Sequence, residues 1–201
     1  MRPAANLKLE VPMGETKVLL HSCCAPCSSA IIEAMVNCGI TPTVFFSNSN
    51  ITPSAEYELR RHECERYVRS FGLEIIDDQY DHNDWLRISR GLEDAPERGP
   101  RCLECFRYRL TRAARYAAEH GFRVLTTTLA SSRWKSLDQV NEAGLAACGT
   151  VNATLGDGAE PVIWWEMNWR KGGLQERRNE IIREQRFYNQ LFCGCEFSSG
   201  K

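Results

Sequence analysis

The sequence lacks both a long apolar run and an excess of charge of either sign. No stretch approaches the roughly 20 apolar residues that a membrane-spanning helix needs, and the first fifteen residues lack the apolar core of a signal peptide. Lys and Arg number 25 against 26 Asp and Glu, a formal net charge of −1, which excludes a strongly basic coat but not a local basic patch. These absences predict a cytoplasmic protein with no membrane partner.

The composition also excludes a disordered chain. Of the 201 residues, 43% are hydrophobic and 25% are charged, which is typical of a folded globular protein. A chain of this length buries roughly 70% of its unfolded surface, so it needs no disulfide bond to fold. One domain is the expected organisation.

Cysteine is the residue type that needs explanation. There are 10 cysteines in 201 residues, about 5% of the chain, which is below the roughly 8–10% of a small secreted disulfide scaffold. In a reducing cytoplasm, clustered cysteines indicate metal binding or redox chemistry instead. Seven of them form three groups, which are Cys23-Cys24-Ala25-Pro26-Cys27, Cys102-Leu103-Glu104-Cys105 and Cys193-Gly194-Cys195. We interpret the isolated Cys38, Cys64 and Cys148 as small buried apolar side chains.

Short apolar runs alternate with amphipathic stretches along the chain. Strands are predicted at 17–20, 43–46, 73–76, 123–127 and 162–165, and helices at 28–36, 53–71, 102–120, 137–147 and 175–188. Pro53 suits the first turn of its helix, and Gly121 ends the long one. The alternation predicts a single-domain α/β fold, with a parallel sheet flanked by helices through right-handed crossovers.

Chemically interesting segments follow the carboxyl ends of the predicted strands, where ligands bind in such folds. They are the loop 23–27, the polar segment 47–50, the threonines 126–128 and the segment 168–171. We therefore expect them to share one rim of the sheet. Cys102 and Cys105 open the long helix, where the helix dipole is expected to lower the thiol pKa and favour a metal-binding thiolate.

Charge is unevenly distributed along the sequence. Residues 50–97 carry 12 acids and 6 bases, a balance of −6, whereas residues 98–135 carry 9 bases and 2 acids, a balance of +7. The basic stretch is either a solvated helix face or a patch that contacts nucleic-acid phosphates.

The cysteine spacing is compatible with three kinds of chemistry. Four thiolates from two paired segments can hold zinc or an iron–sulfur cluster. The adjacent Cys23-Cys24 pair and the two additional thiols at Cys193 and Cys195 favour iron–sulfur over zinc. Metal-free thiol chemistry of the thioredoxin kind at 24–27 leaves the other pairs unexplained. A disulfide between Cys193 and Cys195 would close a small strained ring, which suits electron relay or metal ligation.

Six segments together resemble the cobalamin-independent epoxyqueuosine reductase family. They are HSCCAPCSS (21–29), NSNITPSAEYELR (48–60), GLEDAPERGPRCLECFRYRL (91–110), TTTLASSRWKS (126–136), NWRKGG (168–173) and YNQLFCGC (188–195). The ordered pattern CC-x-x-C, C-x-x-C and C-G-C is highly specific. The resemblance runs from about residue 17 to 198, so residues 1–16 are expected to be an N-terminal extension and 17–198 the reductase domain.

The resemblance implies a reaction, a fold and a set of cofactors. The reaction is the two-electron reduction of epoxyqueuosine to queuosine at the wobble position of tRNA, with the epoxide oxygen lost as water. The fold is nucleotide-alpha-hydrolase-like, with a cysteine-containing C-terminal tail. The cofactors are a 4Fe-4S cluster and an additional iron ion, served by an external electron donor.

The site residues follow from the same resemblance. Cluster ligation is carried onto Cys23, Cys24, Cys102 and Cys105, a redox-active dithiol or disulfide onto Cys193 and Cys195, and help in holding the second iron onto Cys27. The anticodon loop is expected to contact Arg133, Lys135, Arg170 and Lys171. A flipped base is expected to stack on Trp134, Trp169 or Phe106.

The sequence departs from the family pattern at two positions, and two other functions stay open. Ser49 stands where the N-P-N-I loop has proline, and Asn168 replaces an acid. The chief alternative is a zinc-stabilised RNA-binding module without catalysis. An ATP-dependent tRNA thiolation enzyme is disfavoured, because residues 22–26 replace the glycine- and serine-rich loop that such enzymes use for ATP.

Overall fold

The computed structural model describes residues 7–188, 190 and 192–198. Residues 1–6 of the expected N-terminal extension, and Asn189 and Leu191 of the last matching segment, lie outside this range. Among the described residues no helix is long and apolar enough to cross a membrane.

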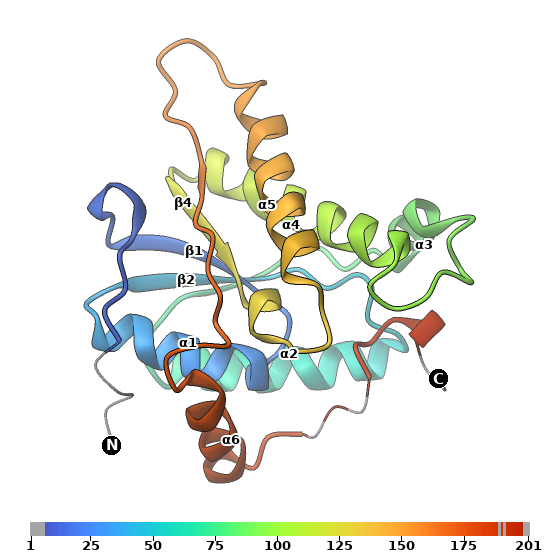
Figure 1. Cartoon of the computed structure of the whole chain (residues 1–201), viewed down its shortest axis with the longest axis horizontal. Helices are drawn as coiled ribbons and strands as arrows, with labels where there is room; N and C mark the ends of the chain where they lie inside the picture. Colours follow the sequence, from blue (N-terminus) through green and yellow to red (C-terminus); the bar gives the residue numbers. More distant parts are fainter. Residues whose placement is uncertain (1–6, 189, 191, 199–201) are drawn as a thin grey trace.

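Five parallel strands form one sheet, as the alternating pattern predicted. They are β1 (Lys17–Ser22), β2 (Thr41–Phe46), β3 (Ile75–Asp77), β4 (Val124–Thr127) and β5 (Ile163–Trp164). Their spatial order is β3-β2-β1-β4-β5 (Figure 1). Strands β2 and β3 therefore lie on one side of β1, and β4 and β5, which come later in the chain, lie on its other side. The crevice beyond the carboxyl ends of β1 and β4 is the point where such folds bind ligands.

In the described part of the chain, six helices flank the sheet. They are α1 (Ala25–Asn37), α2 (Ser54–Arg69), α3 (His82–Ser89), α4 (Pro100–Glu119), α5 (Leu137–Asn152) and α6 (Leu174–Gln185). Helices α1 and α2 lie on one face with α6 against α1, and α4 and α5 pack together on the other (Figure 1). Three 3₁₀ turns complete the fold, η1 (Pro12–Gly14), η2 (Thr128–Ser131) and η3 (Glu196–Ser198).

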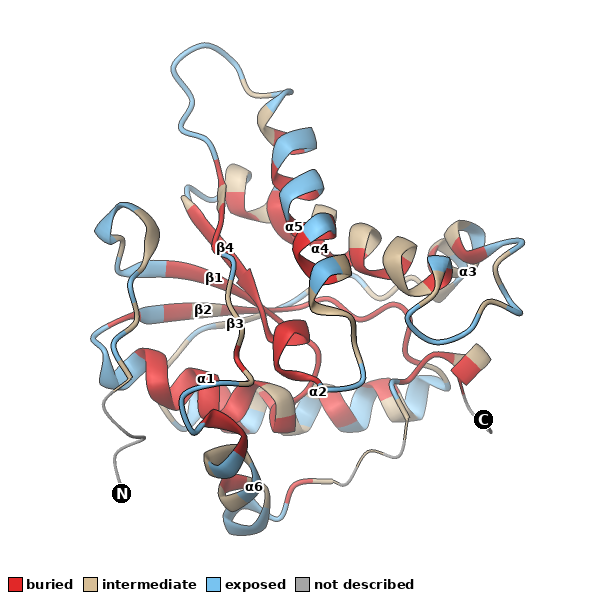
Figure 2. Cartoon of the chain, in the orientation of Figure 1, coloured by how far each residue is buried: buried red, intermediate tan, exposed pale blue. Residues whose placement is uncertain are grey.

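The central strands are buried on both faces, which explains their continuous apolar runs. Val18, Leu19 and Leu20 in β1 are all fully buried, as are Val124 and Leu125 in β4. Figure 2 shows this burial along most of β1, β2 and β4, with the first residues of β1 and β2, Lys17 and Thr41, exposed. Strands covered by helices on both sides have no solvent-facing side chains, so the period-2 alternation of a half-exposed sheet is lost.

Two features of the fold differ from the sequence expectation. Helix α1 begins at Ala25 rather than at residue 28, because Pro26 fits the first turn of a helix, so Cys24 caps α1 and Cys27 lies inside its first turn. Helix α3 was not predicted. Its signal was Asp81, whose side chain caps the helix by accepting a hydrogen bond from the backbone of Asp84 at 2.8 Å.

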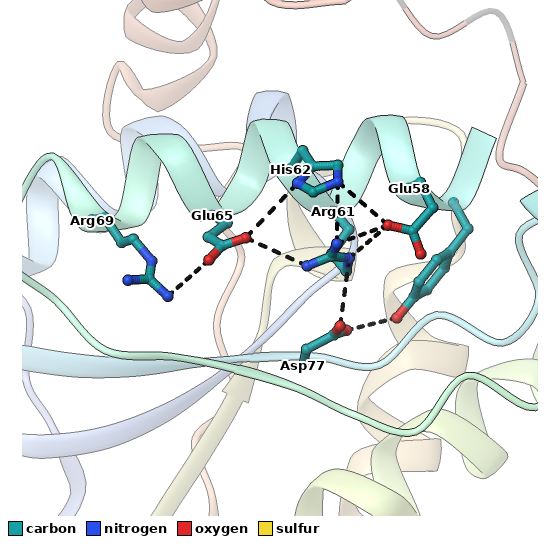
Figure 3. A network of polar contacts seen from close by, with 7 residues as sticks. Glu58, Arg61, His62, Glu65, Arg69 and Asp77 are labelled. Atoms are coloured by element: carbon teal, nitrogen blue, oxygen red, sulfur yellow. Dashed lines mark hydrogen bonds and ion pairs between the residues drawn. The ribbon is translucent and has the colours of Figure 1, made fainter. Parts of the chain in front are cut away.

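The edge strand β3 is held to α2 by an ion-pair network (Figure 3). Arg61 contacts Asp77 at 3.5 Å as well as Glu58 at 2.8 Å and Glu65 at 3.4 Å, and the hydroxyl of Tyr57 donates to Asp77 at 2.7 Å. Exposed ion pairs contribute at most about 1 kcal/mol each. The network therefore fixes an edge of the sheet and involves none of the cysteines.

Candidate metal centre

The first cysteine group lies at the crevice between β1 and β4. Cys23 follows β1, and Cys24 and Cys27 begin α1. The sulfurs of Cys23 and Cys24 are 3.7 Å apart, and all three sulfurs lie within 4.8 Å of one another. Sulfurs that share a tetrahedral metal at about 2.3 Å are roughly 3.8 Å apart. The three thiols are therefore close enough to bind a common metal.

The three thiols shift one another's pKa. Hydrogen bonds from the thiols of Cys24 and Cys27 hold the pKa of Cys23 well below its usual range, and the positive charges of Lys135 and Arg109 lower it further. The same contacts with Cys23 raise the pKa of Cys24 and of Cys27. A metal would take the place of the shared protons, because a metal binds thiolates and releases protons on binding.

Strand β4 leads into a threonine that joins this group. The backbone N–H of Cys23 donates to Oγ1 of Thr128 at 3.1 Å, and the hydroxyl of Thr128 lies 3.4 Å from the sulfur of Cys23. The rim expected from the sequence is therefore present at the ends of β1 and β4, because neighbouring parallel strands bring these two residues together.

A buried layer of polar side chains lies behind the first group. His21 donates from Nε2 to the carbonyl of Ser47 at 3.2 Å, and the hydroxyl of Thr127 donates to its Nδ1 at 2.7 Å. Burial, reinforced by the charge of Arg109, lowers the pKa of His21 to about 3, so the imidazole is neutral. Sequence reasoning missed this histidine, although a histidine at the end of an apolar strand was a visible signal.

Arg109 belongs to the same layer and was also missed as a site residue. Its Nε donates to the carbonyl of Ser47 at 3.0 Å, and its Nη2 donates to the side-chain oxygen of Asn48. Asn48 in turn donates to the carbonyl of Ser22 at 2.9 Å. Helical spacing could have indicated that Arg109 lies near the site, because it follows Cys105 by four residues and shares its side of α4.

The second and third cysteine groups meet beside α3 and α4. Cys105 and Cys195 are buried in one cluster with Trp85, against which Phe197 packs. No disulfide is formed between Cys193 and Cys195 in this structure, in which all ten cysteines are free. A hydrogen bond from Cys195 holds the pKa of Cys193 well below its usual range.

The expectation that the helix dipole lowers the pKa of the α4 thiols is wrong for Cys102. Burial raises the pKa of Cys102, and the nearby Cys105 and Cys193 raise it further. The cost of burying a charge outweighs the dipole at this position. The contribution of Cys193 also indicates that the second and third groups lie close together.

Lys135 interacts electrostatically with the first and third groups. Burial alone would lower its pKa, but the negative charges of Cys23, Cys27 and Cys193 raise it above its ordinary value. Its charge therefore acts on thiols from both ends of the chain, whereas Arg133 beside it is exposed.

The C-terminal tail packs against the rest of the fold, and this packing fixes the position of the third cysteine group. The backbone N–H of Thr52 donates to the carbonyl of Gly194 at 3.0 Å. Arg60 donates to the carbonyl of Phe192 at 3.1 Å and lies over its ring. Phe197 stacks on Trp85 with ring centroids 5.8 Å apart. These contacts bring Cys193 and Cys195 to α3 and α4 from the far end of the chain.

A family model described as epoxyqueuosine reductase QueH matches residues 18–201. The chain belongs to the epoxyqueuosine reductase QueH family. It is 44% identical over 196 residues to the epoxyqueuosine reductase QueH of Histophilus somni, covering 98% of this chain and 77% of that protein. It is 40% identical over 193 residues to the protein of the same name from Acinetobacter baylyi, covering 96% of this chain and 85% of that protein. For the Thermotoga maritima protein of that name, the identity is 30% over 184 residues, covering 90% of this chain and 89% of that protein.

The two residues expected to depart from the family pattern make local hydrogen bonds. Ser49 accepts from the backbone N–H of Asp81 at 3.1 Å through its hydroxyl, and its carbonyl accepts from His82 at 2.8 Å, so it holds the start of α3 in place. Asn168 accepts from the backbone N–H of Arg170 at 3.2 Å and so closes a turn.

Only one of the three aromatic candidates presents an open face. Trp169 and Phe106 are 1% and 3% exposed, so the expectation that they could stack on a base is wrong for both. Trp134 is 77% exposed. Arg98 holds its segment in place by donating to the carbonyls of Arg133 at 2.8 Å and Trp134 at 3.1 Å.

The basic stretch 98–135 forms neither a single patch nor a simple solvated face. Arg101 and Arg109 are buried, and Arg107, Arg112 and Arg123 form ion pairs with acids. Burial and ion pairs therefore take up part of the positive balance of the sequence. Arg98 and Arg170 lie beside residues 133–135, because Arg98 donates to the carbonyls of Arg133 and Trp134 and Arg170 donates to the carbonyl of Lys135 at 2.8 Å.

The isolated cysteines mostly follow expectation. Cys64 and Cys148 are buried, and burial raises the pKa of each to about 12. Cys38 is exposed, so its predicted burial is wrong, because it lies just after the end of α1 rather than on its inner face.

Proposed function

We propose that this chain reduces epoxyqueuosine in tRNA to queuosine. The epoxide gains two electrons and two protons, both carbon–oxygen bonds break, a carbon–carbon double bond forms, and the oxygen leaves as water. The observation that carries the proposal is the grouping of Cys23, Cys24 and Cys27 at the β1–β4 crevice of a QueH-family fold.

The donor set fits a thiolate-bound iron centre. Every candidate ligand is a soft sulfur, a set that favours iron–sulfur clusters or zinc over hard cations. We assign a 4Fe-4S cluster to Cys23, Cys24, Cys102 and Cys105, and an additional iron to a site that includes Cys27. When bound, the cluster supplies single electrons and the iron polarises the epoxide oxygen.

The remaining thiols, Cys193 and Cys195, supply the electrons for the reaction, and Lys135 stabilises thiolates. Oxidation of the Cys193 and Cys195 thiols to a disulfide releases two electrons and two protons, which is what one turnover consumes. An external electron donor then reduces the disulfide. The charge of Lys135 acts on both this dithiol and the first cysteine group, so it stabilises thiolates in both.

The rim around the crevice suits an RNA loop. Trp134 offers an exposed ring on which an unpaired base can stack, and such stacking is worth about 1–3 kcal/mol per base. Of the four cations expected to contact the RNA, Arg133, Arg170 and Lys171 supply the positive charge for the phosphates, since the charge of Lys135 acts on the thiols; Arg133 and Lys171 are exposed. Substitution of Trp134 by Ala is expected to weaken tRNA binding about 5- to 150-fold by that measure.

One experiment tests the reaction and the cofactor together. The protein is reconstituted anaerobically with iron and sulfide, analysed for both, and incubated with tRNA from a strain that lacks the activity, followed by nucleoside mass analysis. The expected result is a brown protein that converts epoxyqueuosine to queuosine. Cys24→Ser is expected to lose iron and activity, whereas the matched Cys148→Ser, in another buried thiol, retains both. A colourless zinc protein that binds tRNA without converting it would refute the proposal.

The RNA interface has its own test. We expect charge reversal at Arg170 and Lys171 to weaken tRNA binding and to reduce the salt slope by about one for each phosphate that the variant no longer neutralises. The matched control is reversal of Arg69, an exposed arginine on α2. An unchanged salt slope in the rim variants would refute the interface assignment while leaving the reaction untouched.

A further inference from the structure

Trp134 combines an exposed ring with a backbone that is held in place. Its side chain is 77% exposed, whereas the other four tryptophans of the chain are at most 7% exposed. The backbone N–H groups of Trp134 and Lys135 both donate to Ser132, to its hydroxyl and to its carbonyl, at 3.3 Å each. The ring therefore projects from a hydrogen-bonded turn, and tryptophan is enriched among the residues that dominate binding surfaces.

Two arginines from other parts of the chain hold the carbonyls of this turn. Arg98 donates from Nη2 to the carbonyl of Arg133 at 2.8 Å and from Nε to the carbonyl of Trp134 at 3.1 Å. Arg170, which follows β5, donates from Nη2 to the carbonyl of Lys135 at 2.8 Å. A guanidinium presents its N–H groups in a rigid plane, so Arg98 fixes two consecutive carbonyls at once.

The backbone of Arg98 is fixed as well, so its side chain extends from a defined position. Arg98 has a φ of +63°, a conformation in which Asn and Asp are enriched and other L-residues are uncommon. Its carbonyl accepts a hydrogen bond from Nε2 of Gln139, in the first turn of α5, at 2.8 Å. The next residue, Gly99, is the N-cap of α4, and its carbonyl accepts from the backbone N–H of Cys102 at 3.1 Å. Arg98 thus joins the turn that carries Trp134 to the start of the helix that bears the second cysteine group.

We propose that Arg98 is a positioning residue for RNA binding, which fixes the ring of Trp134 relative to the start of α4 without contacting the phosphates itself. This inference rests on the proposed function, because the base that stacks on Trp134 belongs to the tRNA loop. It adds a residue outside the set of cations assigned to the phosphates. A ring that is held in place before binding avoids the entropic cost of ordering it in the complex.

The first measurement requires no RNA. Trypsin cleaves after Arg133 and Lys135, and mass analysis of the fragments gives the cleavage rate at these two bonds. Arg98→Asn is expected to accelerate cleavage there about 10-fold or more, because it removes hydrogen bonds from a charged donor. Asparagine is chosen because it tolerates a positive φ. The matched control is Arg186→Asn, at an exposed arginine with a φ of +52° at the end of α6, and it should leave the rate unchanged.

The second measurement is tRNA affinity over a range of salt concentrations. Arg98→Asn is expected to weaken binding roughly 3- to 10-fold, which corresponds to the cost of ordering one loop side chain on binding. The salt slope should stay the same, because no phosphate contact is lost. In a Trp134→Ala background the same substitution should change the affinity less than twofold, because the ring that it positions is gone.

The outcomes separate this inference from the proposed function. A wild type that binds no tRNA refutes the proposed function and this inference with it. A wild type that binds, together with an Arg98→Asn variant of unchanged affinity, overturns the role of Arg98 alone, even where trypsin shows a loosened turn. A salt slope reduced by about one, or an equal loss of affinity in the Trp134→Ala background, also overturns it, because Arg98 would then act on the RNA independently of the ring.

A second variant covers the case in which circular dichroism shows that Arg98→Asn does not fold. Arg98→Lys keeps the charge but lacks the planar fork that holds two carbonyls. It is expected to weaken tRNA binding at least twofold at an unchanged salt slope, and wild-type affinity in this variant would refute the inference.

Discussion

Substitution of Gly194 by alanine is expected to release the dithiol from its docked position. Gly194 has a φ of +98°, a conformation that costs an L-residue about 1–3 kcal/mol. An alanine Cβ would also lie 2.8 Å from Cγ1 of Ile51 and 3.3 Å from a guanidinium nitrogen of Arg60. Such overpacking costs roughly 1–3 kcal/mol more. The tail can relieve both by undocking, so the loss of stability is limited to the free energy with which it docks.

Gly158→Ala is the matched control for this prediction. Gly158 has a φ of +81°, and no atom lies within 4 Å of the position that an alanine Cβ would take, so this variant carries the backbone strain without the steric clash. Gly158→Ala therefore controls for the general effect of an alanine at a positive φ, and any excess in the Gly194 variant reports the strain and the clash in the tail itself; a local cost of about 1–3 kcal/mol raises the undocked population roughly 5- to 150-fold.

The measurement is the rate at which Cys195, only 6% exposed, reacts with a thiol reagent. Gly194→Ala should accelerate this rate by the same factor and lower reductase activity. Equal rates for the Gly194 and Gly158 variants would show that the tail does not depend on the close approach at Ile51, and the reasoning would fail.

Two further predictions concern the packing of the helices. In Gly144→Ala on α5, the new Cβ would lie 2.2 Å from the ring of Trp164, so the free energy of unfolding measured in urea should fall by about 1–3 kcal/mol. The control is Gly149→Ala on the same helix, which has open space around it and should gain about 0.5–1 kcal/mol. Equal effects of the two substitutions would contradict the packing at β5. Glu33→Gln breaks the 2.7 Å ion pair with Arg177 between α1 and α6 and should lower the free energy of unfolding by roughly 1–3 kcal/mol. The loss is smaller than for a fully buried pair because other acids on α6 still contact the arginine. If urea unfolding shows a loss below about 0.5 kcal/mol, this pair is no stronger than an ordinary surface ion pair.

Much of the fold could be predicted from local sequence patterns. The five strands, the parallel α/β class and five of the six helices follow from apolar runs, periodicity and turn residues, which act over a few neighbouring positions. The short α3 was missed because its single buried tryptophan, Trp85, gives too few apolar positions to establish a helical period. The start of α1 was misplaced because a proline at the first turn reads equally well as part of a loop.

The candidate site was predictable in its thiols but not in its surroundings. The cysteine spacing indicated metal or redox chemistry without any structure. The sequence alone could not show that Lys135 interacts electrostatically with the thiols or that Arg109 is buried, because a charge run looks the same whether its members are exposed or buried.

The sequence by itself determined which segments become strands and helices and which residues carry the chemistry, since those properties are local. Only the tertiary structure decided which of them meet. Strand order places β4 next to β1, so that Thr128 contacts Cys23 across 105 positions of sequence. The docked tail likewise brings Cys195 to Cys105. Contacts of that range depend on how strands are ordered and how chain ends pack, and the free energy that fixes them is shared by the whole core rather than encoded in any one motif.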